Sequence, residues 1–145
     1  EWVCGSFYTG CVRVEGNIEH PTASKPGARD LRLLYVPTLS DLELEPVVLG
    51  ERTSDYLTAA GFGVGSDGQL MEREVRVCQD QFGILITSPA ICNGDSGGPL
   101  WDLSGDVPVQ VGVSSFGYGA PGICDLPAGF VNVADNLTWI EENVK

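Results

Sequence analysis

The segment at residues 92–100 (CNGDSGGPL) places a serine among residues that leave the backbone free to adopt uncommon conformations. Gly97 and Gly98 follow Ser96, and glycine both adopts positive φ and lets a ligand approach the backbone closely. With that freedom, the N–H groups of Gly94 and Ser96 can converge on a negatively charged oxygen. The Ser96 hydroxyl lies among the same donors, in the position of a nucleophile. The pattern therefore predicts attack by Ser96 on a carbonyl carbon, with Gly94 and Ser96 forming an oxyanion hole.

Short strands joined by turns must position this segment. The chain has 145 residues, of which 43% are hydrophobic, and its 19 glycines and 9 prolines indicate many turns. Residues 71–77 alternate, with Met71, Val75 and Val77 on one face, as in a half-buried strand. Further strands are predicted at residues 12–14, 32–36, 108–116 and 130–133. The predicted fold class is therefore all-β.

The C-terminus is the one region that reads as a helix. Apolar residues recur there at helical spacing, at Leu137, Ile140 and Val144. Asp135 or Asn136 can cap this helix. Residues 136–138 (NLT) also form an N-glycosylation sequon. Both roles stay open for Asn136.

Charge and cysteine content exclude several classes of protein. Eight Lys and Arg against 20 Asp and Glu give a net charge of −12, which argues against nucleic-acid binding. No run approaches the roughly 18 apolar residues of a membrane span, and no signal peptide begins the chain, so we expect a leader to be removed or not included. The five cysteines are too scattered in the sequence to match the spacing of a zinc site, and there is only one histidine. We therefore expect no metal or cofactor. Disulfides in an oxidising compartment, and hence secretion, are the better interpretation.

The GDSGGP motif at residues 94–99 matches the active-site signature of the trypsin/chymotrypsin-like serine peptidases. The resemblance extends over residues 12–145 and implies a chymotrypsin-like double β-barrel. His20-Pro21 followed by DLRLL at residues 30–34 resembles the segment with the triad aspartate, which implies that role for Asp30. The segment AGFG at 60–63 stands where the family has Gly-Trp-Gly. The segment GVSSFG at 112–117, which includes Phe116, resembles the strand beside the bound peptide. Trp139-Ile140 resembles part of the closing helix.

The resemblance also shows what the sequence lacks. No small-residue-His-Cys motif is present, and Glu1 is a poor substitute for the Ile- or Val-led N-terminus that the family buries against the aspartate before the nucleophile. Asp95 therefore has no obvious partner inside this chain, and we expect His20 to be an ordinary strand-end residue rather than the base. The chain is interpreted as residues 1–50, an incomplete first barrel with Asp30, and residues 51–145, a second barrel with Ser96 and the closing helix. An N-terminal companion polypeptide would supply the catalytic histidine, and this chain alone would be nearly inactive.

The resemblance implies a specificity pocket without charge. Its floor and walls correspond to Ala90, Ser115, Gly117 and Ala128, and a buried Lys or Arg would find no partner there. The implied preference is for apolar side chains. A register shift caused by a short loop between Cys78 and Cys92 would make Ala90 irrelevant, and this alternative stays open.

The resemblance pairs Cys92 with Cys124, a bridge between the nucleophile loop and the pocket wall. Cys4 and Cys11 are close enough in sequence to close a small hairpin. Cys78 is then left over, either bonded to a cysteine outside this chain or buried as a free thiol.

Two functions follow from these observations. One is a secreted serine endopeptidase that acts on protein or peptide substrates and needs the companion polypeptide. The other is a non-catalytic, protease-like binding module. The intact motif around Ser96 favours the first, and the missing histidine favours the second.

Overall fold

The computed structural model describes residues 2–4, 11–22, 27–37, 45–119 and 122–144. Within them the chain forms short strands, one 3₁₀ helix and one α-helix, α1 (Leu137–Asn143). No helix in this part of the chain is long and apolar enough to cross a membrane. The strands are β1 (Trp2–Cys4), β2 (Cys11–Arg13), β3 (Gly16–Glu19), β4 (Arg32–Tyr35), β5 (Val48–Leu49), β6 (Tyr56–Gly61), β7 (Met71–Gln81), β8 (Ile84–Thr87), β9 (Pro99–Asp102), β10 (Val109–Gly117) and β11 (Ala128–Asn132).

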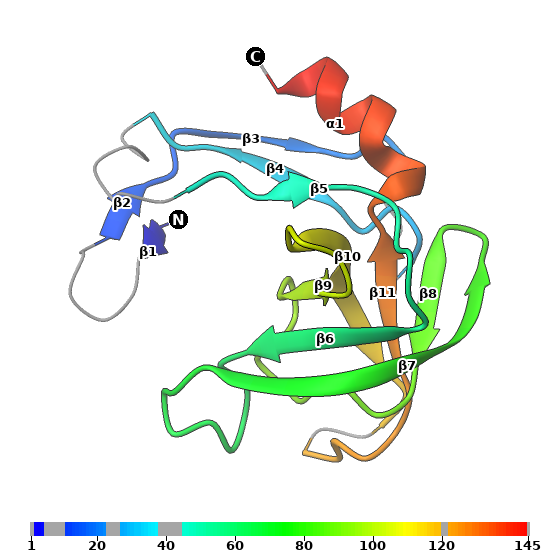
Figure 1. The fold of residues 1–145 in the computed structure, drawn as a ribbon. Coiled ribbons are helices and arrows are strands. Elements are labelled where there is room, and N and C mark those ends of the chain that lie inside the picture. Colours follow the sequence, from blue (N-terminus) through cyan, green and yellow to red (C-terminus); the bar gives the residue numbers. More distant parts are fainter. Residues whose placement is uncertain (1, 5–10, 23–26, 38–44, 120–121, 145) are drawn as a thin grey trace.

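Strands β6 to β11 form a closed barrel, which is visible in the lower half of Figure 1. Its order is β11-β8-β7-β6-β9-β10, and β10 pairs back with β11 to close it. Strand β5 is added to β10 in parallel. The barrel is filled by apolar side chains that are at most 1% exposed, namely Leu57, Val75, Leu85, Leu100, Val111 and Phe130. The all-β expectation is confirmed.

The predicted alternation over residues 71–77 is confirmed at Val75 and Val77 only. Val75 and Val77 are buried while their neighbours face solvent, as the two-residue period of a strand requires. Met71 is 55% exposed because it is the first residue of β7 and pairs with Gly61 at the end of β6. The predicted inward position of Met71 is therefore wrong.

The N-terminal part of the chain forms two separate two-stranded sheets, β1–β2 and β3–β4. Strands β3 and β4 lie on the same side of the barrel as α1 (Figure 1), and Leu34 and Val144 line one shared cavity. Two open sheets beside one closed barrel agree with an incomplete first barrel. The domain boundary near residue 50 stays a prediction, since β5 just before it pairs with the barrel.

A buried carboxylate joins β9 to the segment that enters β6. Asp102, at the end of β9, is 3% exposed. Its Oδ2 accepts hydrogen bonds from the backbone N–H groups of Thr53 (2.6 Å) and Ser54 (3.1 Å), and its Oδ1 accepts one from the N–H of Ser104 (2.9 Å). Burial alone would raise the pKa of Asp102, but the hydrogen bonds from Ser104 and Thr53 outweigh it and hold the pKa below its ordinary value.

The C-terminal helix is present where the apolar spacing predicts it, and Asn136 stands at its N-cap position. Its side chain is not hydrogen-bonded as a cap. It is 3% exposed, and its Nδ2 donates hydrogen bonds to the carbonyl oxygens of Asn132 (2.8 Å) and Ala28 (3.4 Å). These hydrogen bonds connect the start of the helix to Ala28 in the N-terminal region.

Candidate active site

Ser96 lies exposed in the turn that leads from β8 to β9. Gly94 and Gly97 have φ angles of +96° and +82°, a region that other residues avoid. The turn is held against β10 because the Gly97 N–H donates to the Ser114 carbonyl (2.9 Å) and the Ser114 N–H donates to the Gly98 carbonyl (2.8 Å). Gly94 and Gly97 therefore allow the uncommon backbone conformation that the motif predicts.

Two backbone donors beside Ser96 have no acceptor among the described residues. The N–H groups of Gly94 and Ser96 take part in no hydrogen bond there, whereas those of Asp95, Gly97 and Gly98 all do. Unpaired donors next to a hydroxyl are what stabilisation of a developing oxyanion needs.

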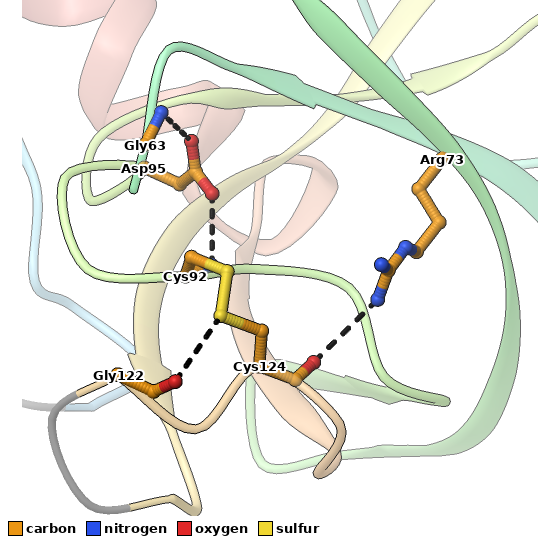
Figure 2. The surroundings of a disulfide bond; sticks show 6 residues. All are labelled: Gly63, Arg73, Cys92, Asp95, Gly122 and Cys124. Atoms are coloured by element: carbon orange, nitrogen blue, oxygen red, sulfur yellow. Dashed lines mark hydrogen bonds between the residues drawn. A yellow bond between two sulfur atoms is a disulfide. The ribbon is translucent and has the colours of Figure 1, made fainter. Parts of the chain in front are cut away.

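Asp95 accepts hydrogen bonds from two backbone N–H groups of this chain, which the sequence does not indicate. Its Oδ1 accepts a hydrogen bond from the Gly63 N–H (2.7 Å), and its Oδ2 accepts one from the Cys92 N–H (2.8 Å), as Figure 2 shows. A Cβ on Gly63 would lie 2.6 Å from the Asp95 carboxylate, and one on Gly61 would overlap it. The two glycines of the AGFG segment are the sequence feature that could have indicated this contact. They lack side chains where the Asp95 carboxylate approaches the backbone.

The predicted bridge between Cys92 and Cys124 is confirmed, with the two Cα atoms 4.9 Å apart. Figure 2 shows that it joins the nucleophile loop to the segment after β10, where Arg73 Nη1 donates to the Cys124 carbonyl oxygen (3.5 Å). Cys78 is free and exposed, so the alternative of a buried thiol is wrong. Cys11 is disulfide-bonded and lies opposite Cys4 in the register of β1 and β2, while the side chain of Cys4 lies outside the described residues.

Asp30 lies just before β4 and is held by β10. The hydroxyl of Ser115 donates to Asp30 Oδ2 (2.8 Å), and the Gly27 N–H donates to the same hydroxyl oxygen (3.3 Å). The Asp30 N–H donates to the Gly27 carbonyl (3.1 Å), which closes the turn. Sequence reasoning assigned Ser115 to the pocket wall and missed this contact, because the two residues come from opposite parts of the chain.

Ser96 and Asp30 line one cavity of about 600 Å³. Ser114 and Ser115 form its polar side, and its apolar wall comes from β4, β5 and α1, at Leu33, Leu34, Leu49 and Trp139. The structure thus brings together the predicted nucleophile and the predicted acid. No imidazole lies among the described residues that line this cavity.

The single histidine is packed elsewhere. His20 is 5% exposed, and its ring lies 4.7 Å from that of Trp139 on α1, in a tilted arrangement. Its Nδ1 lies 3.2 Å from the hydroxyl oxygen of Thr22. Burial, and then the positive charge of Arg29, lower the pKa of His20. These contacts agree with a structural rather than a catalytic histidine.

Ser96 also lines a second cavity, of about 280 Å³. It is lined by Gly94, Gly117, Gly119 and three larger residues, Ile91, Asn93 and Ile123, together with Cys92. Of the four predicted pocket residues only Gly117 lines it. Ala128 is fully buried in the core, and Ala90 packs against the core and lines a separate cavity with Asp95.

Phe116, predicted to lie beside the bound peptide, packs on the backbone of the neighbouring strand. A Cβ on Gly129 would overlap its ring, and Tyr118 contacts it edge-on at 5.4 Å between ring centroids. Gly129 therefore makes room for the Phe116 ring. The described residues contain no cluster of three or more His, Cys, Asp or Glu side chains suited to a metal ion.

A family model described as Trypsin matches residues 12–140. The chain belongs to the trypsin/chymotrypsin-like serine peptidase family. Among relatives, tissue-type plasminogen activator of Sus scrofa is 43% identical over 54 residues, and CLIP domain-containing serine protease B4 of Anopheles gambiae is 43% identical over 56 residues. Each match covers 37% of this chain but only 9% and 15% of these relatives, respectively.

A solved structure of the family also matches the fold. Neuropsin, a serine protease expressed in the limbic system of mouse brain, aligns with a TM-score of 0.70 and 21% identity. The alignment covers 93% of this chain and 72% of neuropsin. At this identity the likeness concerns the fold, and it agrees with a chymotrypsin-like architecture that has one closed barrel, β6 to β11, in the described residues.

Proposed function

We propose that this chain carries the nucleophile and the acid of a serine endopeptidase that hydrolyses peptide bonds. Ser96 is the nucleophile, Gly94 and Ser96 supply the oxyanion donors, and Asp30 orients the imidazole of the general base. One observation carries the proposal: Ser96 and Asp30, far apart in sequence, line the same cavity of about 600 Å³. A cavity of this size between them has room for the missing ring.

Each step of the reaction uses a group at this site. Ser96 Oγ attacks the carbonyl carbon of the substrate and gives its proton to the imidazole. The negative charge on the carbonyl oxygen is stabilised by the unpaired N–H groups of Gly94 and Ser96. The imidazole then protonates the leaving amine, and water hydrolyses the acyl-enzyme by the same path. Asp30 stabilises the imidazolium, and its own position depends on the hydrogen bond from Ser115.

The imidazole in this proposal comes from polypeptide outside residues 1–145. The His20 ring packs against Trp139, its Nδ1 is hydrogen-bonded to the Thr22 hydroxyl, and the sequence has no other histidine. Among the described residues β1–β2 and β3–β4 are sheets of two strands each, and an N-terminal companion segment that adds strands to them would complete the first barrel.

We further propose that the substrates are proteins or peptides with apolar side chains before the cleaved bond. No charged residue among those described lines the cavity of about 280 Å³, so a Lys or Arg side chain would be buried there without a partner. The Cys92–Cys124 disulfide supports action in an oxidising, extracellular environment.

The test is covalent labelling of Ser96 by an organophosphonate in the full-length protein that contains these residues. We expect Ser96→Ala to abolish labelling and Asp30→Asn to slow it by up to about 10⁴-fold, the loss known when a triad aspartate is replaced. Asp106→Asn removes an exposed carboxylate and serves as the control. Equal labelling of the Ser96→Ala protein would refute the assignment.

A second arm tests the source of the base. The 145-residue chain alone should label slowly, and free imidazole should accelerate labelling because the cavity between Ser96 and Asp30 is open to it. An absence of labelling in the full-length protein would instead favour the non-catalytic binding module, for which the buried position of His20 is the supporting observation.

A further inference from the structure

We propose that an apolar groove on the outer face of the closed barrel binds an extended segment of a partner polypeptide, in which apolar residues lie between two basic ones. The groove has a volume of about 430 Å³ and shares no lining residue with the two cavities that Ser96 lines. Binding there goes beyond the proposed function and does not depend on the reaction of Ser96.

The floor of the groove is the outward side of β9. Leu100 and Asp102 are buried while Trp101 between them is partly exposed, so the Trp101 side chain lies on the solvent side of the barrel. Apolar side chains that are 49–56% exposed line the groove together with Trp101, namely Val47, Val48, Leu103 and Val107. Adjacent apolar side chains with this much exposure are typical of interaction sites.

Two carboxylates lie on opposite sides of this apolar floor. Glu72 belongs to β7 and Glu45 lies just before β5, and these two strands are on either side of β9 in the sheet order. Both side chains line the groove and are exposed, and neither has a hydrogen-bond or ion-pair partner in the described part of the chain. Among the described residues that line the groove, none is Lys or Arg. A ligand with a positive charge near each end would therefore pair with Glu45 and Glu72.

The strand order sets the distance that such a ligand must span. From β5 to β7 the strands follow in the order β5-β10-β9-β6-β7 (Figure 1), and Trp101 pairs with Gln110 on β10 and with Thr58 on β6. With about 4.8 Å between neighbouring strands, the four steps from β5 to β7 cover at most about 19 Å. An extended chain rises about 3.3 Å per residue, so basic residues separated by four others lie about 17 Å apart. A six-residue extended segment with basic ends therefore matches the groove.

Charge favours this occupant over a second copy of the chain. The net charge of −12 makes two copies repel each other, whereas the same field attracts a basic segment. The apolar residues of the segment would cover Trp101 and its apolar neighbours, and removal of such surface from water is the main favourable contribution to association.

The experiment titrates two peptides of equal length and opposite charge into the full-length protein carrying Ser96→Ala, which prevents hydrolysis. The peptides are acetyl-Arg-Leu-Val-Leu-Val-Arg-amide and acetyl-Glu-Leu-Val-Leu-Val-Glu-amide, and the NMR signal of the Trp101 indole N–H measures binding. We expect the Arg peptide to bind about tenfold or more tightly, since each of two exposed ion pairs changes the affinity by a factor of about three. This ratio should fall at about 1 M salt, where the Debye length is about 3 Å.

Matched charge variants locate the effect in the groove. Replacing both groove carboxylates, by Glu45→Gln and Glu72→Gln, should bring the ratio of the two affinities close to one. Glu141→Gln with Glu142→Gln removes the same charge from exposed positions on α1 that do not line the groove, and the ratio should stay nearly unchanged.

A second pair of variants tests the apolar floor. Leu103→Ser should weaken binding of the Arg peptide by about fivefold, because a half-exposed leucine then no longer becomes buried on binding. Leu126→Ser alters an exposed leucine that does not line the groove and should leave the affinity as it is.

Three results of the titrations would overturn the proposal: an unmoved Trp101 signal, equal affinities of the two peptides, or a ratio that both double variants change alike. Sedimentation velocity tests the other occupant. A dimer that Leu103→Ser dissociates would also overturn the proposal, because a second copy of the chain would then occupy the groove.

Discussion

Replacing Asp102 with asparagine tests how strongly the buried carboxylate at the end of β9 holds the second barrel together. The Asp102 carboxylate accepts five hydrogen bonds. Its Oδ2 accepts three, from Thr53 N, Thr53 Oγ1 and Ser54 N, and its Oδ1 accepts two, from Ser104 N and Ser104 Oγ. The two hydroxyls can rotate to accept a hydrogen bond from the amide NH₂ group, but the backbone N–H groups can only donate. In its best orientation, the asparagine NH₂ group faces the Ser104 N–H.

The expected loss of stability follows from this geometry. One hydrogen bond to a charged group, worth about 1.5–3 kcal/mol, disappears, and a buried N–H is left unsatisfied at a further cost of about 1 kcal/mol or more. We expect Asp102→Asn to lower the free energy of unfolding by about 2–4 kcal/mol at pH 7. Urea unfolding followed by tryptophan fluorescence measures it. Asp106→Asn, which removes an exposed carboxylate in the next turn, should change it by less than about 0.5 kcal/mol.

The pH dependence gives a second check. The pKa of Asp102 is lower in the folded than in the unfolded chain, so its stabilising effect is complete above the ordinary value near 4 and is lost as the pH falls below it. The difference between the parent protein and Asp102→Asn should therefore shrink by about 1.4 kcal/mol for each pH unit below 4. A difference under about 1 kcal/mol at pH 7, or one that is constant between about pH 6 and 3, would refute the reasoning.

Two further predictions concern the disulfide and the histidine. Replacing Cys92 and Cys124 together by serine should cost about 3–4 kcal/mol of unfolding free energy, because the bridge closes a loop with a sequence separation of 32; a loss below about 1 kcal/mol in urea unfolding would contradict this. Burial and the charge of Arg29 lower the pKa of His20 in the folded protein. The unfolding free energy of the parent protein minus that of His20→Phe should therefore be constant above the ordinary pKa of about 6.5 and should fall as the pH drops below it. A relative stability that is the same at about pH 8 and pH 5 would argue against burial of a neutral imidazole.

The sequence by itself was sufficient for features whose cause is local. Gly94 and Gly97 of GDSGGP have positive φ, which glycine adopts readily, so the turn that exposes Ser96 could be predicted from residue types alone. The apolar alternation at Val75 and Val77 and the helical spacing at Leu137 and Ile140 predicted a strand and a helix where both occur. These patterns depend on neighbours along the chain, which a sequence displays directly.

Partners from distant segments were decided only by the tertiary structure. Asp95 has no obvious partner in the sequence, yet the turn containing Gly63 approaches it closely enough for a hydrogen bond. The Ser115–Asp30 contact joins β10 to the segment before β4, and no spacing along the chain indicates it. Counting back from Ser96 assigns Ala90 to the pocket floor, whereas Ala90 lines a separate cavity with Asp95, and Ile91 lines the cavity of about 280 Å³ beside Ser96. Which side chains meet across a barrel depends on strand register and on the volume that each neighbour fills, and these are determined only when the whole chain is packed.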